Sequence, residues 1–318
     1  MKHLYFLACD KAGGVYHYTL ENELFSFREK LDLDCPMYMI TEGRKAYIIL
    51  REIDSTTRFG GLIVCDIAED GSLKNPSEPV STNGIVPCHL CRNGGNTYVV
   101  NYLSGNLVKS DGLTVTHSGV GVNLPRQDMP HTHFVSPAPD GYLLCCDLGL
   151  DTVFVYDENL CEISKAKVPD GMGPRHLEFS KDGKTVWCVN ELGNTVSIFD
   201  YEKGHLTLRE TVEALPDFSG KNTAAAIRRK GDLLFVSHRG ADTIAVFKIL
   251  SDGGLKLMES TPCGGSSPRD ILPVGEFLLS ANETTDNVTV LKVEGEKLIV
   301  SDIAFEMKNP LCICSLEI

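Results

Sequence analysis

Short apolar runs alternate with polar turns along the whole chain. Typical runs are YLLCC, TVWCV, LLFVS and FLLSA, and each is followed by a turn containing Gly, Asn or Asp and then by an alternating segment such as TVSIFDY. These patterns indicate β-strands connected by hairpins. The 3.6-residue periodicity of amphipathic helices is nearly absent, so the sequence predicts an all-β protein.

The strand pattern is repeated at a regular interval. Five segments align with one another: NYLSGNLV, DLGLDTVFVY, NELGNTVSIF, HRGADTIAVF and NETTDNVTVL, which start at Asn101, Asp147, Asn190, His238 and Asn282. Their starts lie 43 to 48 residues apart. This interval is typical of the blades of a β-propeller, in which each repeat forms one small sheet.

Further partial repeats bring the number of units to seven. One unit runs from Pro36 through Ile49 and continues at Gly60, and the chain ends ACDKAGGVYHYTL and NPLCICSLEI each resemble part of another. We therefore predict a seven-bladed β-propeller with four-stranded antiparallel blades, closed by a blade that Met1–Leu20 shares with the C-terminal strands. Because no Pro-rich or Ser-rich linker interrupts the sequence, residues 1–318 are predicted to form a single domain.

The composition and the net charge disfavour some classes of binding partner. The chain is 42% hydrophobic and 23% charged, as in soluble globular proteins, and its net charge of −13 disfavours binding to nucleic acid or anionic lipid. No apolar run approaches the roughly 18 residues of a membrane span, and the opening MKHLYFLACDKAGG is too short and polar for a signal peptide. We expect a cytoplasmic protein with no nucleic-acid or membrane partner.

The 12 cysteines are predicted to be structural. Many lie within apolar runs and are expected to be small buried residues: Cys65, Cys145, Cys146, Cys188, Cys312 and Cys314. Cys88 and Cys91 have C-x-x-C spacing, but no second pair with zinc-ligand spacing follows them, and a thioredoxin-like βαβ pattern is missing. We therefore predict neither metal nor redox chemistry at this pair.

Cationic and polar residues are concentrated where the inner strands of the predicted blades begin. Equivalent positions of successive blades converge on the central channel, so residues far apart in the sequence become neighbours. A purely structural propeller has no need of cations there, which favours a functional role. By contrast, Asn101, Asp147, Asn190 and Asn282 are expected to satisfy backbone groups in hairpins. The predicted substrate-binding residues are His89, His131, His176, Arg228, Arg269 and Asp270.

Several longer motifs resemble a known family. GPRHLEFSKDGKTVWCVNELGNTVSIFDY, HTHFVSPAPDG with DLGLDTVFVYD, and LFVSHRGADTIAVFKI resemble the repeats of the cytosolic seven-bladed lactonases, which include propeller-type 6-phosphogluconolactonases and fungal carboxymuconate-lactonizing enzymes. The resemblance extends from about Pro36 to the C-terminal NPLCI and differs from common members at Ala226 and Glu283. It implies a catalytic site formed by His133, Arg175, Glu191 and Arg239.

Lactone hydrolysis requires an activated water, a polarised carbonyl group and stabilisation of an oxyanion. Either Glu191 or His133 can act as the general base, while Arg175 and Arg239 are suited to holding the oxyanion or a substrate phosphate or carboxylate. The resemblance thus implies hydrolysis of 6-phosphogluconolactone to 6-phosphogluconate, a reaction of the pentose phosphate pathway, with a small anionic sugar lactone as partner. Carboxymuconate-type cyclisation and a non-catalytic binding scaffold remain alternatives.

No cofactor is expected. The sequence lacks G-x-S-x-G, G-x-x-x-x-G-K-[ST], H-E-x-x-H and a G-x-G-x-x-G that follows a strand, which disfavours a serine nucleophile, nucleotide binding and a zincin site. The arginines next to the candidate carboxylates also disfavour a divalent metal.

Overall fold

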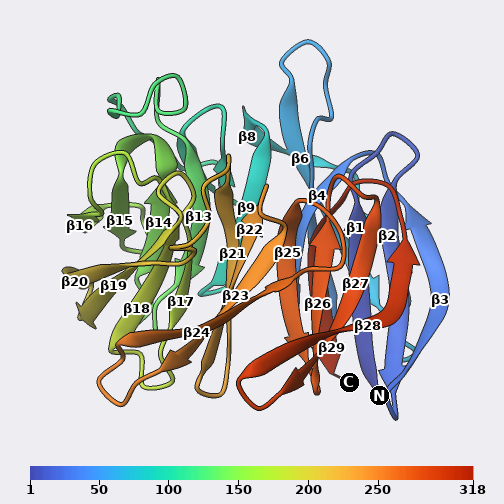
Figure 1. The fold of residues 1–318 in the computed structure, drawn as a ribbon. Helices are drawn as coiled ribbons and strands as arrows, with labels where there is room; N and C mark the ends of the chain where they lie inside the picture. The colour runs from blue at the N-terminus through green and yellow to red at the C-terminus, as the bar shows by residue number, and fades with distance from the viewer. Residues whose placement is uncertain (318) are drawn as a thin grey trace.

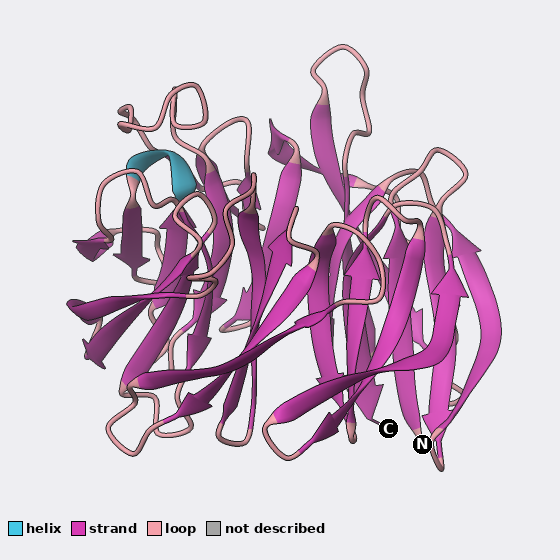
Figure 2. Ribbon diagram, in the orientation of Figure 1, coloured by secondary structure: helices cyan, strands magenta, loops and turns pink. Residues whose placement is uncertain are grey.

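The computed structural model describes residues 1–317 and consists almost entirely of antiparallel strands and turns (Figures 1 and 2). Seven sheets follow one another along the chain, as the repeat predicts. Within the described residues the one helical element is the short 3-10 turn η1 (Leu148–Leu150), cyan in Figure 2. The prediction of an all-β, seven-bladed propeller is confirmed.

The first three blades contain the N-terminal third of the chain and its C-terminal strand. Blade 1 consists of β29 (Pro310–Glu317), β1 (Lys2–Ala8), β2 (Gly14–Glu21) and β3 (Leu24–Asp32). Blade 2 consists of β4 (Pro36–Glu42), β5 (Lys45–Leu50), β6 (Phe59–Ile67), β7 (Leu73–Lys74) and β8 (Val80–Ile85). Blade 3 consists of β9 (Pro87–Asn93), β10 (Asn96–Asn101), β11 (Asn106–Lys109) and β12 (Thr114–Thr116).

The other four blades each contain four consecutive strands. Blade 4 consists of β13 (Thr132–Pro137), β14 (Leu143–Asp147), β15 (Thr152–Tyr156) and β16 (Glu162–Lys167). Blade 5 consists of β17 (Pro174–Phe179), β18 (Thr185–Asn190), β19 (Thr195–Glu202) and β20 (His205–Glu213). Blade 6 consists of β21 (Thr223–Lys230), β22 (Leu233–Arg239), β23 (Thr243–Ile249) and β24 (Leu255–Pro262). Blade 7 consists of β25 (Pro268–Val274), β26 (Phe277–Asn282), β27 (Asn287–Glu294) and β28 (Lys297–Glu306).

Blade 1 closes the ring by pairing the two ends of the chain. β29 is its inner strand and pairs with β1, opposing Tyr5 to Cys314, and Figure 1 shows the two termini side by side. The inner strands β29, β4, β9, β13, β17, β21 and β25 contact one another in this order, and β25 contacts β29. This closure removes the free sheet edges that an open array would expose, and it confirms the predicted blade shared by both termini.

Blade 2 departs from the four-stranded pattern. β6 is long enough for two partners on its outer edge: β7 pairs with its end at Asp66 and Ile67, while β8 pairs with its start between Phe59 and Leu62. The blade therefore has five strands instead of four, with two of them sharing the outermost position.

The hydrophobic core lies between adjacent blades. Alternate residues of each strand face one neighbouring blade or the other, as the alternating sequence pattern requires. Trp187 of blade 5, for example, packs in one cluster with Val236 and Phe247 of blade 6. Nine of the twelve cysteines are buried, while Cys35 and Cys314 are half-buried and Cys161 is exposed, and all twelve thiols are free.

Each inner strand contains a β-bulge near its first residue. In β13, for example, Thr132 pairs with Asp147 and Phe134 pairs with Cys146, so that His133 is the extra residue. A bulge breaks the strict alternation of side chains and turns the extra one toward a new direction. The extra residues are Met37, Cys88, His133, Arg175, Arg269 and Leu311, and in β21 Ala225 and Ala226 both lie opposite Ser237.

Candidate active site

The bulged ends of the inner strands surround a cavity of about 370 Å³ at one end of the channel. Strands of six blades contribute to its walls, the seventh blade contributes Glu191, which directly follows β18, and the other lining residues lie in connections between strands. The lining residues are Met37, Arg51, Val86, Cys88, Tyr102, Leu103, Arg126, His133, Glu191, Arg239, Arg269, Glu283, Asn309 and Leu311.

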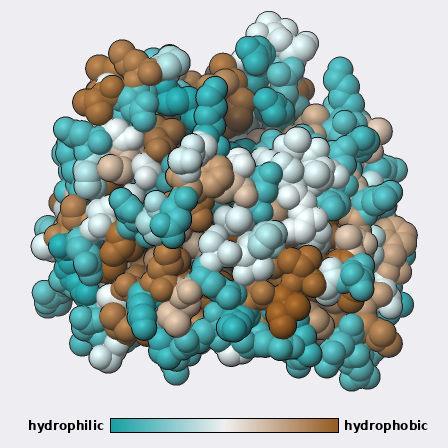
Figure 3. All heavy atoms as spheres, viewed as in Figure 1, coloured by the Kyte–Doolittle hydropathy of each residue, from teal (hydrophilic) through white to brown (hydrophobic). Residues whose placement is uncertain are grey.

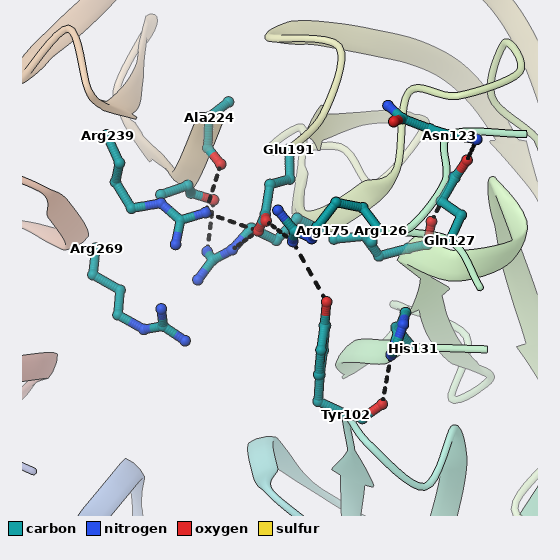
Figure 4. Close-up of polar contacts among 12 residues, drawn as sticks. Tyr102, Asn123, Arg126, Gln127, His131, Arg175, Glu191, Ala224, Arg239 and Arg269 are labelled. Atoms are coloured by element: carbon teal, nitrogen blue, oxygen red, sulfur yellow. Dashed lines mark hydrogen bonds and ion pairs between the residues drawn. The ribbon is translucent and has the colours of Figure 1, made fainter. Parts of the chain in front are cut away.

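The carboxylate of Glu191 is the centre of the polar contacts in this cavity (Figure 4). Glu191 directly follows β18, and its position is fixed by a backbone hydrogen bond from its N–H to the carbonyl of Gly173 at 2.7 Å. Arg126 Nη2 donates a hydrogen bond to Glu191 Oε1 at 2.6 Å. Arg239 Nη2 and Arg175 Nε form ion pairs with Oε2 at 2.9 and 3.1 Å. A single buried carboxylate thus holds three guanidinium groups together.

These contacts determine the charge state of Glu191. Burial by itself raises the pKa of this carboxyl group, but Arg239 and Arg175 outweigh burial and hold the pKa well below its usual range. The carboxylate is therefore ionised near neutral pH. Burial, with Arg239 and Arg269, lowers the pKa of Arg175 to about 9, which still leaves this side chain cationic at neutral pH.

His133 is the bulged residue of β13 and lines the cavity. Burial, followed by the nearby Arg175, lowers the pKa of its imidazole well below the usual value. The ring is therefore neutral near pH 7, and a neutral imidazole can accept a proton from water. Its centroid lies 5.6 Å from that of Tyr102 and 5.4 Å from that of His176.

The cavity is cationic although the protein is acidic. Arg51, Arg126, Arg239 and Arg269 line it together with the two carboxylates of Glu191 and Glu283, whereas the chain as a whole has a net charge of −13. On the face shown in Figure 3, hydrophobic residues are scattered among hydrophilic ones. A local positive potential in a concave site concentrates anionic ligands, so the cavity favours an anion over a neutral or cationic ligand.

The structure separates the six predicted substrate-binding residues. Arg269 lines the cavity and lies 3.5 Å from Glu283. His176 and Asp270 line a small void that also borders Arg175 and His133.

The remaining three predicted contacts line neither the cavity nor this void. Arg228 forms an ion pair with Asp270 at 2.8 Å. His89 packs between the rings of Tyr38 and Phe134, with centroid distances of 4.3 and 4.2 Å. His131 stacks on Tyr102 at 4.4 Å. These positions favour a supporting role for the three residues.

The four residues expected to stabilise hairpins are fully buried and form hydrogen bonds with neighbouring groups, although Oδ1 of Asn101 has no partner within the described residues. Asn101, Asn190 and Asn282 each donate a hydrogen bond to the residue five positions later, at 2.8, 2.9 and 3.0 Å. Asp147 accepts from the backbone N–H of His131 and Gly149. The structural interpretation is therefore supported, although the asparagines bond mainly to side chains where backbone partners were expected.

Among the cavity residues with a guanidinium or hydroxyl group, sequence analysis did not identify Arg51, Tyr102 and Arg126. Arg51 and Tyr102 directly follow the second strands of blades 2 and 3, which is the repeat position of Glu191 in blade 5. Repeat alignment therefore contained a signal for both. Arg126 lies in the loop between β12 and β13, outside the repeat, and no pattern in the sequence pointed to it.

Two kinds of feature were not found in the part of the chain that the structure describes. Within residues 1–317 no group of three or more His, Cys, Asp or Glu side chains is arranged to hold a metal ion. In the same range, no helix has the length and apolar character needed to cross a membrane.

These observations define a seven-bladed propeller with a polar site of His, Arg and Glu residues at its channel. The family described as Lactonase, 7-bladed beta-propeller matches residues 4–315, and the chain belongs to this family. An uncharacterized protein of Lactococcus lactis subsp. cremoris is 32% identical over 306 residues, covering 87% of each chain.

Solved structures of similar proteins superpose over nearly the whole chain. A protein from Lactobacillus plantarum has a TM-score of 0.89 at 29% identity, with all of both chains covered. A candidate 6-phosphogluconolactonase from Bacteroides fragilis has a TM-score of 0.88 at 25% identity, covering 99% of this chain and 98% of the other. The periplasmic gluconolactonase of Pseudomonas aeruginosa, with a TM-score of 0.88, 24% identity and coverage of 100% and 99%, shares the fold.

The buried histidines beside the cavity predict an acid-sensitive fold. Burial, followed by nearby arginines, lowers the pKa of His89, His133 and His176 well below the usual value. Below about pH 6.5 the unfolded chain therefore binds protons that the folded protein does not. The free energy of unfolding should be largest above this pH and should decrease as the pH falls, by up to about 1.4 kcal/mol per pH unit for each histidine.

Urea denaturation at several pH values between 7.5 and 5 measures this dependence. Exchanging His176 for glutamine removes one of the three groups and should reduce the slope, whereas the exposed His205 provides a matched control whose replacement should leave the slope unchanged. A stability profile that is flat over this range would contradict the buried, neutral state of the three histidines.

Proposed function

We propose that this protein hydrolyses an anionic sugar-acid lactone, with 6-phosphogluconolactone as the leading substrate. The observation that supports this proposal best is the position of a neutral imidazole, His133, in the same cavity wall as the carboxylate and guanidinium cluster around Glu191. A base for water and cations for a developing oxyanion are the groups that ester hydrolysis requires. Membership in the lactonase family gives the same reaction class.

The proposed roles follow from the charge states. His133 accepts a proton from water as the water oxygen attacks the lactone carbonyl carbon, and the electron pair of the carbonyl bond moves to its oxygen. Arg239, together with Arg175, stabilises the resulting oxyanion. Collapse of this intermediate breaks the bond to the ring oxygen, which leaves as an alkoxide and takes the proton from His133.

Glu191 is assigned a different role from that of the base. Both of its carboxylate oxygens are already bound by guanidinium groups, Oε1 by Arg126 and Oε2 by Arg175 and Arg239, so neither is free to take a proton from water. Its three contacts instead hold the guanidinium groups in a fixed arrangement. Preorganised donors cost no reorganisation during the reaction, which is the main source of their effect on rate.

A substrate panel tests the proposal. Purified protein is incubated with 6-phosphogluconolactone, gluconolactone and a carboxymuconolactone, and spontaneous hydrolysis is subtracted at each pH. We expect enzyme-dependent opening of the phosphorylated lactone with a higher kcat/KM than for the neutral one. Rates equal to spontaneous hydrolysis for all three compounds would overturn the proposal and favour a binding scaffold.

One observation favours a second candidate, a carboxymuconate-type lactone. Met37, Val86, Leu103 and Leu311 give the cavity an apolar wall. An apolar wall fits an unsaturated carbon skeleton better than a polyhydroxylated sugar, while the arginines are equally suited to carboxylates. Turnover of the carboxymuconolactone in preference to both sugar lactones would select this alternative.

A further inference from the structure

Arg126 differs from the other arginines that contact Glu191. Arg175 and Arg239 belong to the blades, and their side chains are 3% and 15% exposed. Arg126 comes from the loop between β12 and β13, and its side chain is 45% exposed while it still reaches Glu191. Figure 4 shows its guanidinium group between the carboxylate of Glu191 and the hydroxyl of Tyr102, which lies 3.5 Å from Arg126 Nη2. Arg126 therefore connects the buried cluster with the open mouth of the cavity.

Both ends of the loop that carries Arg126 are fixed to one buried carboxylate. Asp147 Oδ2 contacts His117 Nδ1 at 2.5 Å, at the start of the loop. Asp147 Oδ1 accepts a hydrogen bond from the backbone N–H of His131 at 2.8 Å, at its end. Asp147 is completely buried, so water does not compete for these contacts.

The middle of the loop is fixed by the neighbour of Arg126. Gln127 is completely buried, and its side chain donates to the carbonyl of Leu148 at 2.8 Å and to Asp151 Oδ1 at 2.7 Å. Its amide oxygen accepts from the backbone N–H of Asn123 at 2.8 Å. The backbone at Arg126 is therefore held in place while its side chain extends into solvent and over the cavity, which is how a recognition residue is preorganised.

The guanidinium group of Arg126 retains donors for a ligand. Its Nη2 contacts Glu191 and Tyr102, while its Nε and Nη1 have no partner among residues 1–317. By comparison, Arg175 Nη1 already donates to the carbonyl of Ala225 at 2.7 Å and lies 3.1 Å from His176. Arg126 lines the cavity and its side chain is 45% exposed, so the part of a substrate remote from its reacting carbonyl can reach it.

We propose that Arg126 is a specificity-determining residue, which binds the anionic substituent of the lactone and thereby selects charged over neutral lactones. This inference rests on the proposed lactonase function and adds to it a residue outside the repeat. Forked hydrogen bonds from a guanidinium to phosphate or carboxylate oxygens provide both the attraction and the geometry. A neutral lactone has no anionic substituent and therefore forms no such hydrogen bonds with Arg126.

Kinetics with a charged and a neutral lactone test this role. For Arg126→Gln, kcat/KM for 6-phosphogluconolactone should fall roughly 10- to 100-fold, mainly through KM, since one charge-assisted contact is lost. For gluconolactone the loss should be several-fold smaller, because that substrate loses only the support that Arg126 gives to Glu191 and no direct contact. Arg126→Lys, which keeps the charge without the fork, should recover part of the loss. Arg44→Gln, at the β4 to β5 turn on the opposite end of blade 2, is a matched control expected to change neither substrate.

Two outcomes would overturn the assignment. Equal losses for the charged and the neutral lactone would show that Arg126 acts only by positioning Glu191. Unchanged kinetics for both lactones would show that it has no role in recognition.

A binding measurement separates this proposal from the proposed function. If the wild-type protein opens neither lactone, the lactonase proposal fails, and calorimetric titration with 6-phosphogluconate and gluconate then tests Arg126 alone. Tighter binding of 6-phosphogluconate by wild type, reduced roughly 10-fold or more in Arg126→Gln, would support the anion-binding role. Equal affinities of the two proteins for 6-phosphogluconate would overturn it.

Discussion

Replacing His133 with glutamine is expected to lower kcat for the lactone by about 10²- to 10⁴-fold, the range by which positioned general bases accelerate reactions. The imidazole lines the cavity and is neutral because burial, followed by Arg175, lowers its pKa. Glutamine keeps a polar side chain of similar size but cannot take a proton from water. Steady-state kinetics with subtraction of spontaneous opening measure the loss.

The matched control for this variant is His205→Gln, on the exposed outer strand β20. It should have wild-type turnover, and both variants should unfold at similar temperatures, because the Nδ1 atom of His133 makes no hydrogen bond within the described residues. Turnover of His133→Gln within a few-fold of wild type would exclude His133 as the base.

Replacing Glu191 with glutamine is expected to reduce both stability and activity. The change removes the negative charge that holds Arg126, Arg175 and Arg239 together, so three guanidinium groups repel one another in a site where Glu191 is 4% exposed. Removing one partner of a buried ion pair costs about 3–5 kcal/mol of unfolding free energy. The arginines also lose their arrangement, which should lower kcat/KM by about 10²- to 10³-fold.

Denaturant unfolding and kinetics on the same preparations check this expectation. Glu283→Gln is the matched control. Glu283 lines the same cavity, but within residues 1–317 its carboxylate has one ion-pair partner, Arg269 at 3.5 Å, and it is about one-third exposed, so loss of its charge should have a much smaller effect on stability. A Glu191→Gln protein of wild-type stability that loses activity together with the acidic limb of its pH profile would instead identify Glu191 as the general base.

The repeat in the sequence was sufficient to predict the architecture. The interval between NELGNTVSIF and its copies corresponds to one blade, and the two incomplete units at the chain ends became β2 with the turn before it and β29, both in blade 1. The prediction was less accurate in blade 2, where five strands are present. The start of β6 pairs with β8 after a long connection, and pairing between segments that are distant along the chain is not encoded in a local pattern.

The candidate site could be predicted only in part. His133, Glu191, Arg239 and Arg269 occupy repeat positions that were identified from the sequence, and they line one cavity. His89 and Arg228, also at equivalent positions, do not line it. The difference arises at the bulges. In five inner strands the extra residue lines the cavity and its neighbours in the strand do not, whereas the extra residues of β17 and β21 do not line it. An extra residue of this kind depends on how two strands pair, which the sequence of one strand does not reveal.

The sequence by itself determined the all-β class, the seven repeats and the closure by both termini, because strand alternation and hairpin turns are local properties of the chain. Only the tertiary structure decided the chemistry of the site. Burial and the convergence of three arginines set the charge state of Glu191, and burial keeps His133 neutral. Arg126 reaches the same carboxylate because a loop from outside the repeat is fixed over the channel by Asp147 and Gln127. These properties depend on distances between residues far apart in the sequence, and such distances exist only in the folded chain.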